Sequence, residues 1–235
     1  MDRFDFRNSL LTVMERKHDP RWEKFTSGEV PAELLHHHLE QEWGVYVRDF
    51  PVLVGRAYEQ CPIPEVRQAL AANLYEEDTG GIVSGKPHPE LFLEYPRGLG
   101  MDLSRFEEVE LVPDARAYRD VLDEMSQNRG WAVAAAVVTI FVEGTPYDRH
   151  VLEQSAPARP TPPLDQHPLV LHYGLPLEAL ARAHRSVEGE HRVAAWKIVL
   201  DHTPEQEHIS VLAAMDRTLG AWQYYRNAVG RLCGA

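Results

Sequence analysis

The chain contains little cysteine and no long apolar run. Its two cysteines, Cys61 and Cys233, form neither a disulfide framework nor a C-x-x-C motif, which is typical of proteins from a reducing compartment. The longest apolar run, Trp131–Val142, has about twelve residues, whereas a membrane-spanning helix needs about 20. These absences exclude a disulfide-stabilised module and predict no membrane span.

Positive charge is also scarce. The 24 lysines and arginines are outnumbered by 36 aspartates and glutamates, so the formal net charge is −12. Such acidity argues against nucleic acid or an anionic membrane surface as the partner. The first residues, Met1–Asp5, lack the apolar core of a signal peptide. We therefore expect a cytoplasmic protein that acts on small molecules.

The apolar pattern is helical throughout. Apolar residues recur with a period near 3.6 and show no convincing period of two, which predicts helices without strands. Prolines in first turns mark several helix starts. With 235 residues, the chain is long enough for one sizeable core. We predict a single all-α domain over residues 1–235, a bundle of about seven to eight helices. They are expected at Phe4–Lys17, Pro31–Gln60, Pro64–Glu77, Pro89–Leu99, Pro113–Gln127, Gly130–Glu143, Pro176–His202 and Pro204–Leu232.

Two segments break this pattern. Thr79–Pro87 is rich in glycine, which predicts a mobile loop, and Ser155–Pro168 is rich in proline, which predicts an irregular excursion or lid. Pro51 lies inside the second helix and should kink that helix rather than end it.

The most informative residues are His184, Glu188 and His191. They occupy positions i, i+4 and i+7 of Leu175–His202, which is expected to form one long helix, so they share a face. That face is otherwise apolar, because Leu177 and Ile198 continue the same steps of seven. A carboxylate in a helical core is costly unless it is paired or bound to metal. The trio therefore indicates a metal site, with a buried structural hydrogen bond as the alternative.

Three further residues are candidates to complete this site. Glu77 lies seven residues after Leu70 and should face inward, whereas Glu76 is turned away by more than a right angle. His88 begins the following helix, and Glu143 ends the most apolar one. Three carboxylates and three imidazoles suit two Fe(II) or Mn(II) ions. Glu76 stays open as the ligand in place of Glu77, and a solvated helix end stays open for Glu143.

The order and local text of these residues resemble the haem-oxygenase-like diiron oxidases and oxygenases. The segments Asn73–Asp78 and His88–Phe92 are similar to that family's Asn-Leu-x-Glu-Glu and His-Pro-Glu-Leu signatures, and His184, Glu188 and His191 fall where it has His-x3-Asp-x2-His. The superfamily shares its helical fold with haem oxygenase, thiaminase II and pyrroloquinoline-quinone synthase. A glutamate, Glu188, stands where aspartate is commoner.

The resemblance implies an iron-dependent oxidoreductase. It would hold two Fe ions, cycling between Fe(II) and Fe(III), on Glu77, His88, Glu143, His184, Glu188 and His191. It would activate O2 to oxidise a small organic substrate derived from an amino acid or a fatty acid. An external electron donor and a homodimer belong to the same expectation.

Some related activities fit the sequence less well. Thiaminase II needs a thiolate on an inner helix, yet no cysteine lies between Cys61 and Cys233. A chlamydial relative uses a lysine shortly after the middle glutamate, whereas the first lysine after Glu143 is Lys197. Metal-free oxidation, as in pyrroloquinoline-quinone synthase, and a non-catalytic helical binding module remain alternatives.

Other histidines and carboxylates are interpreted as structural or left open. The tract His36-His37-His38 surrounds a helix circumference, so it should lie mostly at the surface without one shared ligand face. The Glu-x-x-His pairs that begin at Glu33 and Glu205 lie in first helical turns, where acidic residues favour the helix dipole. Glu42 follows an inward stripe and is either an acceptor for a ligand histidine or an additional carboxylate.

Overall fold

The computed structural model describes residues 1–19, 21–183 and 188–235, with only the backbone described for residues 188–191. Its described residues contain helices and no strands, which confirms the all-α prediction. They form fourteen α-helical segments, more than the sequence suggested. The first half contains α1 (Arg3–Glu15), α2 (Trp22–Thr26), α3 (Ala32–Glu42), η1 (Trp43–Val47), α4 (Phe50–Gln60), α5 (Pro64–Thr79), α6 (His88–Phe92), α7 (Glu94–Gly98) and η2 (Leu103–Phe106). The second half contains α8 (Pro113–Asn128), α9 (Trp131–Ala135), η3 (Ala136–Val142), α10 (Arg149–Leu152), η4 (Leu164–Gln166), α11 (Pro168–Leu171), α12 (Leu177–Ala183), α13 (Glu188–His202), η5 (Glu205–Glu207) and α14 (His208–Leu232).

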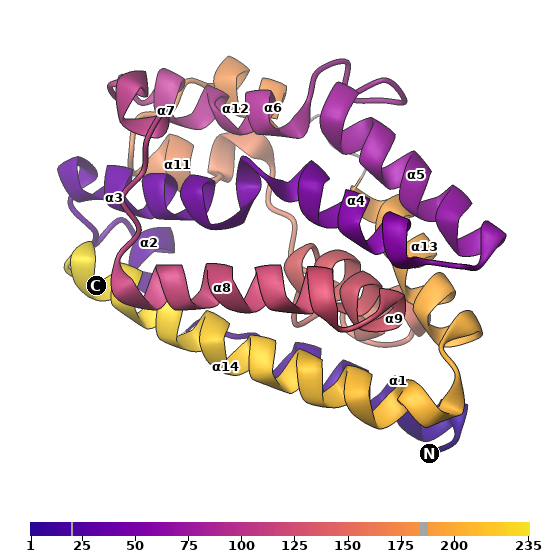
Figure 1. The fold of residues 1–235 in the computed structure, drawn as a ribbon. Coiled ribbons are helices and arrows are strands. Elements are labelled where there is room, and N and C mark those ends of the chain that lie inside the picture. Colours follow the sequence, from indigo (N-terminus) through magenta and orange to yellow (C-terminus); the bar gives the residue numbers. More distant parts are fainter. Residues whose placement is uncertain (20, 184–187) are drawn as a thin grey trace.

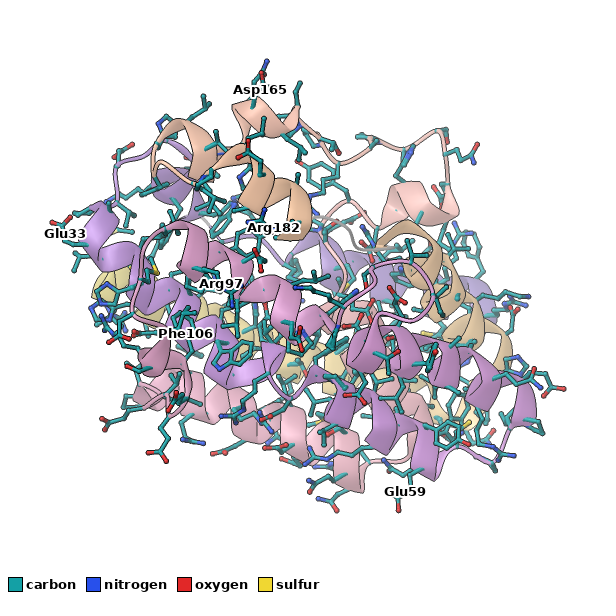
Figure 2. All side chains as sticks on the ribbon, turned by 90° about the horizontal axis from the view of Figure 1, so that it is seen from above. Glu33, Glu59, Arg97, Phe106, Asp165 and Arg182 are labelled. Carbon is teal, nitrogen blue, oxygen red and sulfur yellow. The ribbon has the colours of Figure 1, made fainter. Side chains whose placement is uncertain are left out.

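The long helices form the body of the molecule (Figure 1). α14 packs along α8 and also contacts α1, while α4 packs against α5 and α9. The short helices α6, α7 and α12 gather at one side of this body, where α12 contacts both of the others. Glu94 of α7 links this group, because it accepts hydrogen bonds from Arg97 and from Arg182 of α12. The two arginines are labelled in Figure 2.

The core is built around the most apolar segment of the sequence. Every residue of Trp131–Phe141 is buried, as expected for a helix surrounded by others. Small side chains such as Ala134 and Ala136 allow neighbouring helices to approach closely. The hydroxyl of Thr139 donates to the carbonyl oxygen of Ala135 at 2.8 Å, so this polar group is satisfied inside the core.

Two predicted helices contain π-helical turns. The segment predicted as Pro31–Gln60 is divided by the π-helix η1 and a two-residue turn before α4. Pro51 therefore does not kink a continuous helix; it stands in the first turn of a new one, where its missing N–H costs nothing. The predicted helix Gly130–Glu143 is continuous, but its second half, η3, is also π-helical.

Other predicted boundaries shift by short interruptions. The segment Pro89–Leu99 forms two short helices, α6 and α7, and the segment Pro204–Leu232 begins with the 3-10 turn η5. The predicted helix Leu175–His202 corresponds to α12 and α13, and its continuity across residues 184–187 lies outside the described residues. The proline-rich stretch is irregular as predicted, apart from η4 and the start of α11. Among the described helices, none combines the length and apolar character that crossing a bilayer requires.

Candidate metal and substrate site

One cavity collects the sequence candidates that the structure describes. It has a volume of about 260 Å³ and lies between the end of α5, the start of α6 and the two π-helical segments. Glu77, His88 and Glu143 all line it. The remaining lining residues are mostly apolar or aromatic: Tyr46, Val47, Phe50, Leu91, Phe92, Tyr95, Val142, Ala183 and Arg192. Because π turns are frequent at functional sites, their position at this cavity is notable.

Glu77 and His88 contact each other directly. The Glu77 Oε2 atom lies 2.7 Å from Nδ1 of His88, and the Glu77 side chain is almost completely buried. Glu77 comes from the last turn of α5, and His88 is the first residue of α6. The fold thus brings these two side chains together across the loop between them, as a shared metal site requires.

Glu76 also lies near His88, with its Oε1 atom 4.0 Å from the Nε2 atom, so its expected outward position is wrong. It is completely buried, and its carboxylate accepts hydrogen bonds from the backbone amides of Ile82, Val83 and Ser84 at 2.7, 3.2 and 2.8 Å. Burial alone would raise the pKa of Glu76, but these hydrogen bonds outweigh burial and lower the pKa to about 2.

The glycine-rich loop is therefore anchored from inside. Gly80 ends α5 with a φ of +64°, and a Cβ atom there would lie 2.2 Å from the backbone nitrogen of Lys86. Only glycine allows the chain to fold back so sharply. This turn brings residues 82–84 onto Glu76, whose carboxylate accepts from three of the loop's amides. The predicted mobility of the loop stays a prediction.

Glu143 reaches the cavity from the end of η3. Its Oε1 atom accepts a hydrogen bond from Nδ2 of Asn73 at 3.0 Å. Asn73 is buried in α5, one turn before Glu77, so α5 supplies one cavity carboxylate and orients the other. The helix end of Glu143 is therefore not simply solvated.

The backbone around Glu143 is held by Lys17. The Lys17 Nζ atom donates to the carbonyl oxygens of Phe141, Val142 and Gly144 at 2.6, 3.2 and 2.8 Å. Such carbonyls at a helix end attract a cation. Burial, reinforced by nearby arginines, lowers the pKa of Lys17 to about 7. No local sequence pattern indicates this role for Lys17, because its partners are more than 120 positions away.

Arg192 supplies a guanidinium to the cavity wall. It pairs with the buried carboxylate of Asp148, which also accepts a hydrogen bond from Nε1 of Trp196 at 3.0 Å. Burial lowers the pKa of Arg192, while the charge of Glu143 opposes this effect. The Nε atom of Arg192 is buried and has no hydrogen-bond partner among the described residues. It is therefore a donor available to a bound acceptor.

The structure describes only part of the predicted ligand trio His184, Glu188 and His191. His184 lies outside the described residues, and Glu188 and His191 are described only as backbone of α13. Their role as ligands stays a prediction. Ala183 and Arg192, which bracket the trio in the sequence, both line the cavity.

A second buried polar group surrounds Arg226. Its Nε atom donates to Asp19 at 2.9 Å, and its NH1 atom lies 3.3 Å from Nδ1 of His38. The Nε2 atom of His38 lies 3.1 Å from Glu42, which also accepts a hydrogen bond from Tyr46. His38 is 4% exposed, so its expected surface position is wrong. The reason is Arg226, a partner 188 residues away that no local pattern reveals.

Glu42 therefore belongs to this network rather than to the first cavity. It lines a separate cavity of about 540 Å³, together with Lys17 and Arg226. Burial raises its pKa, but His38, Arg226 and Tyr46 outweigh burial and lower it to about 2. Glu42 does not line the cavity of Glu77 and Glu143, so the alternative of an additional cavity carboxylate is not supported. A contact between Glu42 and His184 or His191 lies outside the described residues.

His208 and the two cysteines make structural contacts away from the cavities. His208, from the pair that begins at Glu205, stacks on Phe6 with ring centroids 3.9 Å apart, and its Nδ1 atom lies 2.8 Å from the carbonyl oxygen of Met1. Both cysteines are buried, and burial raises the pKa of each thiol, that of Cys233 to about 11. Neither cysteine lines one of the cavities described above.

Comparison with known proteins agrees with this architecture. A family model described as "iron-containing redox enzyme" matches residues 37–223. A TenA homolog from Pseudomonas syringae pv. tomato has a similar fold, with a TM-score of 0.71 at 12% identity over 96% of this chain and 91% of that one. A TenA family transcription regulator from Silicibacter sp. TM1040 gives a TM-score of 0.54 at 13% identity, over 92% and 96% of the two chains. Among curated proteins, none matches. At such identities, the two structures show the fold alone.

Proposed function

Because the chain belongs to the family of iron-containing redox enzymes, whose haem-oxygenase-like fold it shares, we propose that it is a nonhaem diiron oxidase or oxygenase. It would use O2 to oxidise a small organic substrate. One observation carries this proposal: Glu77, His88 and Glu143, from three different helical segments, meet at one cavity.

The donor set fits iron. Two carboxylates and an imidazole are ligands that Fe(II) accepts readily, and buried carboxylates call for a nearby positive charge. Glu77, His88 and Glu143 would hold the metal from this side, and His184, Glu188 and His191 are the predicted ligands of the other. Bound iron would supply the electron-transfer chemistry with O2 that no side chain offers.

The protein residues have their own tasks at this site. In the described state, the carboxylate of Glu77 engages Nδ1 of His88, which fixes the orientation of the imidazole ring. Asn73 fixes one oxygen of Glu143, and Lys17 holds the backbone on both sides of that residue. Ligands held in this way need little reorganisation when a cation binds.

The cavity wall favours a particular kind of substrate. Val47, Phe50, Leu91 and Phe92 form an apolar lining, and Arg192 contributes a guanidinium beside it. A substrate with an apolar body and an anionic head would satisfy both, with its carboxylate accepting from Nε of Arg192. Derivatives of amino acids or fatty acids have this form. The volume of about 260 Å³ favours small members of these classes.

Anaerobic loading with Fe(II), followed by exposure to O2, tests the proposal. The wild-type protein should bind about two Fe(II) per chain and consume O2. Glu77→Ala, His88→Ala and Glu143→Ala should each lower iron content and O2 uptake. Glu90→Ala is the matched control, since Glu90 is an exposed carboxylate two residues from His88. Wild-type iron content and O2 uptake in all three cavity variants would refute a metal site here.

The same assay tests the predicted ligands His184, Glu188 and His191 and the metal-free alternative. His184→Ala, Glu188→Ala and His191→Ala should lose iron as the cavity variants do, whereas Glu188→Asp should retain iron but turn over more slowly. Substrate oxidation at full rate in protein stripped of metal would instead support a metal-free oxidase. A thiaminase-like reaction is disfavoured, because neither buried cysteine lines the cavity.

A further inference from the structure

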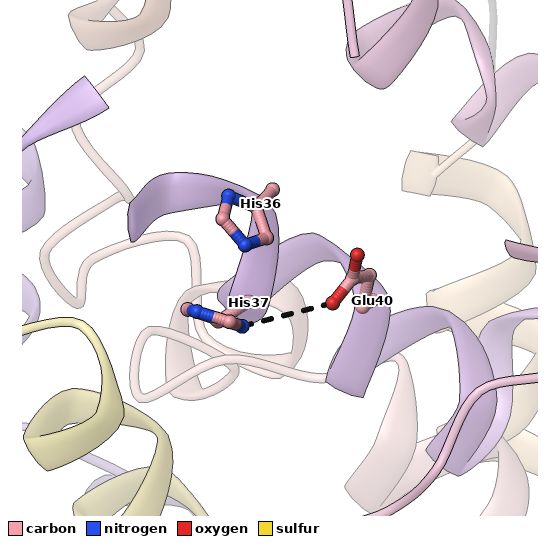
Figure 3. Close-up of side chains that lie close together, drawn as sticks. All are labelled: His36, His37 and Glu40. Carbon is pink, nitrogen blue, oxygen red and sulfur yellow. Dashed lines mark ion pairs between the residues drawn. The ribbon is translucent and has the colours of Figure 1, made fainter. Parts of the chain in front are cut away.

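A separate group of ligand-type side chains lies on α3. His36, His37 and Glu40 each offer an atom within 4.8 Å of the others (Figure 3). None of the three lines the cavity of Glu77 and Glu143. Among the side chains that the structure describes, this is the one group of three histidine, cysteine or carboxylate ligands that meets this distance. The sequence expectation that the histidine tract has no shared ligand face is therefore wrong for His36 and His37.

Helix geometry explains why these side chains converge. Glu40 follows His36 by four residues and His37 by three, so it lies one turn further along the same side. The two imidazole centroids are 3.9 Å apart, and Nδ1 of His37 lies 3.7 Å from Oε2 of Glu40. The latter distance is too long for a hydrogen bond, so a small cation between these atoms would not displace one.

Glu40 is a buried carboxylate that depends on a single external cation. It is 8% exposed, and burial raises its pKa while Arg105 and His37 counteract that effect. Arg105 comes from η2, and its Nε atom lies 2.5 Å from Oε1 of Glu40. The Arg105 side chain is 42% exposed, so water would solvate its guanidinium if another cation took its place.

We propose that His36, His37 and Glu40 form a second metal site, selective for a divalent ion of borderline character such as Zn²⁺ or Co²⁺. Two imidazoles and one carboxylate are a ligand set that such ions accept, with water in the fourth position. The site differs from the first in its open surroundings: His36 also lines a cavity of about 470 Å³ with Glu33, Asp102 and Arg105. That space accommodates the water ligand and the displaced guanidinium.

Arg105 and a bound metal would compete for Glu40. The guanidinium of Arg105 pairs with this carboxylate, and its positive charge opposes a dication in the same place.

Calorimetric titration with Zn²⁺ near pH 7.5 tests the proposal in the full-length protein. His36→Ala, His37→Ala and Glu40→Gln should each weaken binding at one site by about tenfold or more. Arg105→Gln should strengthen binding by about fivefold, since a partly exposed ion pair contributes less than a factor of ten. His202→Ala, which removes a histidine from the end of α13, should bind Zn²⁺ as the wild type does. Far-UV circular dichroism verifies that each variant is folded.

A double variant that lacks two ligands of the proposed iron site distinguishes the two metal sites. In His88→Ala/Glu143→Ala protein, one Zn²⁺ should still bind, and adding His37→Ala should remove that binding. Co²⁺ absorption should show the same loss of an imidazole ligand. The proposal is overturned if the histidine variants bind Zn²⁺ like the wild type, or if Arg105→Gln weakens binding. Neither result depends on whether the first cavity holds iron.

Discussion

Two groups of buried or partly buried carboxylates are balanced in different ways. Around Arg226, the carboxylates of Asp19 and Glu42 share a network with a permanent cation that is itself buried. In the cavity, Glu77 faces an imidazole and Glu143 accepts from a neutral amide. The first arrangement supplies its own positive charge and needs no ligand. The second is the better place for a cation from solution, because Glu77 faces a titratable imidazole and the guanidinium in the cavity wall, Arg192, already pairs with Asp148.

Removing Arg226 should have the largest effect on stability. Arg226→Met leaves Asp19 and Glu42 buried without their guanidinium, which should lower the free energy of unfolding by about 3–5 kcal/mol. Urea denaturation measures this loss. Iron binding by the remaining folded protein should be unchanged; a loss of iron with normal stability would mean that the network serves the cavity after all.

Acid should break the same network through Glu42. Its pKa is held near 2, below the ordinary 4.5, so its contribution is present above pH 4.5 and is lost as the pH falls from about 4.5 to 2. That contribution reaches about 3 kcal/mol at most. In urea denaturation series at several pH values, Glu42→Gln should therefore approach wild-type stability at low pH. A constant difference between the two proteins from pH 7 to pH 2 would contradict this assignment.

Glu76 and Glu77 are adjacent on α5, and they allow a direct comparison of a carboxylate satisfied by the protein with one proposed to bind metal. Glu76→Ala leaves three loop amides without their acceptor and should lower the free energy of unfolding by about 2 kcal/mol. Glu77→Ala should change stability less and iron content more. Thermal unfolding and metal analysis of both variants decide between these roles, and similar profiles for the two would remove the distinction.

The smallest effect is expected at Asn73. Asn73→Leu removes the hydrogen bond to Glu143 while keeping a side chain of similar size, so stability should change by about 1 kcal/mol. Turnover should fall severalfold, because Glu143 loses an orienting partner. Asn227→Leu is a control, since Asn227 accepts from Arg21 away from the cavity. Equal activity of Asn73→Leu and wild type would show that Asn73 does not position Glu143.

Helical periodicity predicted much of this arrangement and failed where distant partners decide. The step of seven from Leu70 placed Glu77 in the interior, and the apolar run from Trp131 identified the central helix. Helical periodicity was wrong for Glu76, because the loop that buries this residue folds back only after Gly80 reverses the chain. Periodicity describes one helix at a time, so it does not detect contacts that the turns between helices create.

The histidine tract His36-His37-His38 shows the same limit of helical periodicity. Its three members were expected to spread around α3, yet His38 is drawn inward by Arg226, and His36 and His37 tilt toward Glu40. Side-chain torsions and a partner near the end of the chain decide these positions. The π turns of η3 were equally unforeseeable, since every residue of Ala136–Phe141 is buried and an additional residue leaves no visible break in an apolar run.

Those π turns let the cavity accommodate an additional residue in the chain. In η3, the wider turn accommodates one more residue than an α-helix would before Glu143. If the same residues formed an ordinary α-helix, Glu143 would be rotated by about 100° relative to the helix before it and would turn away from the cavity. A segment one residue shorter would form an α-helix that ends at nearly the same angle. Homologous segments that differ by one residue are therefore expected to hold this carboxylate in the same position, with a π turn in the longer segment.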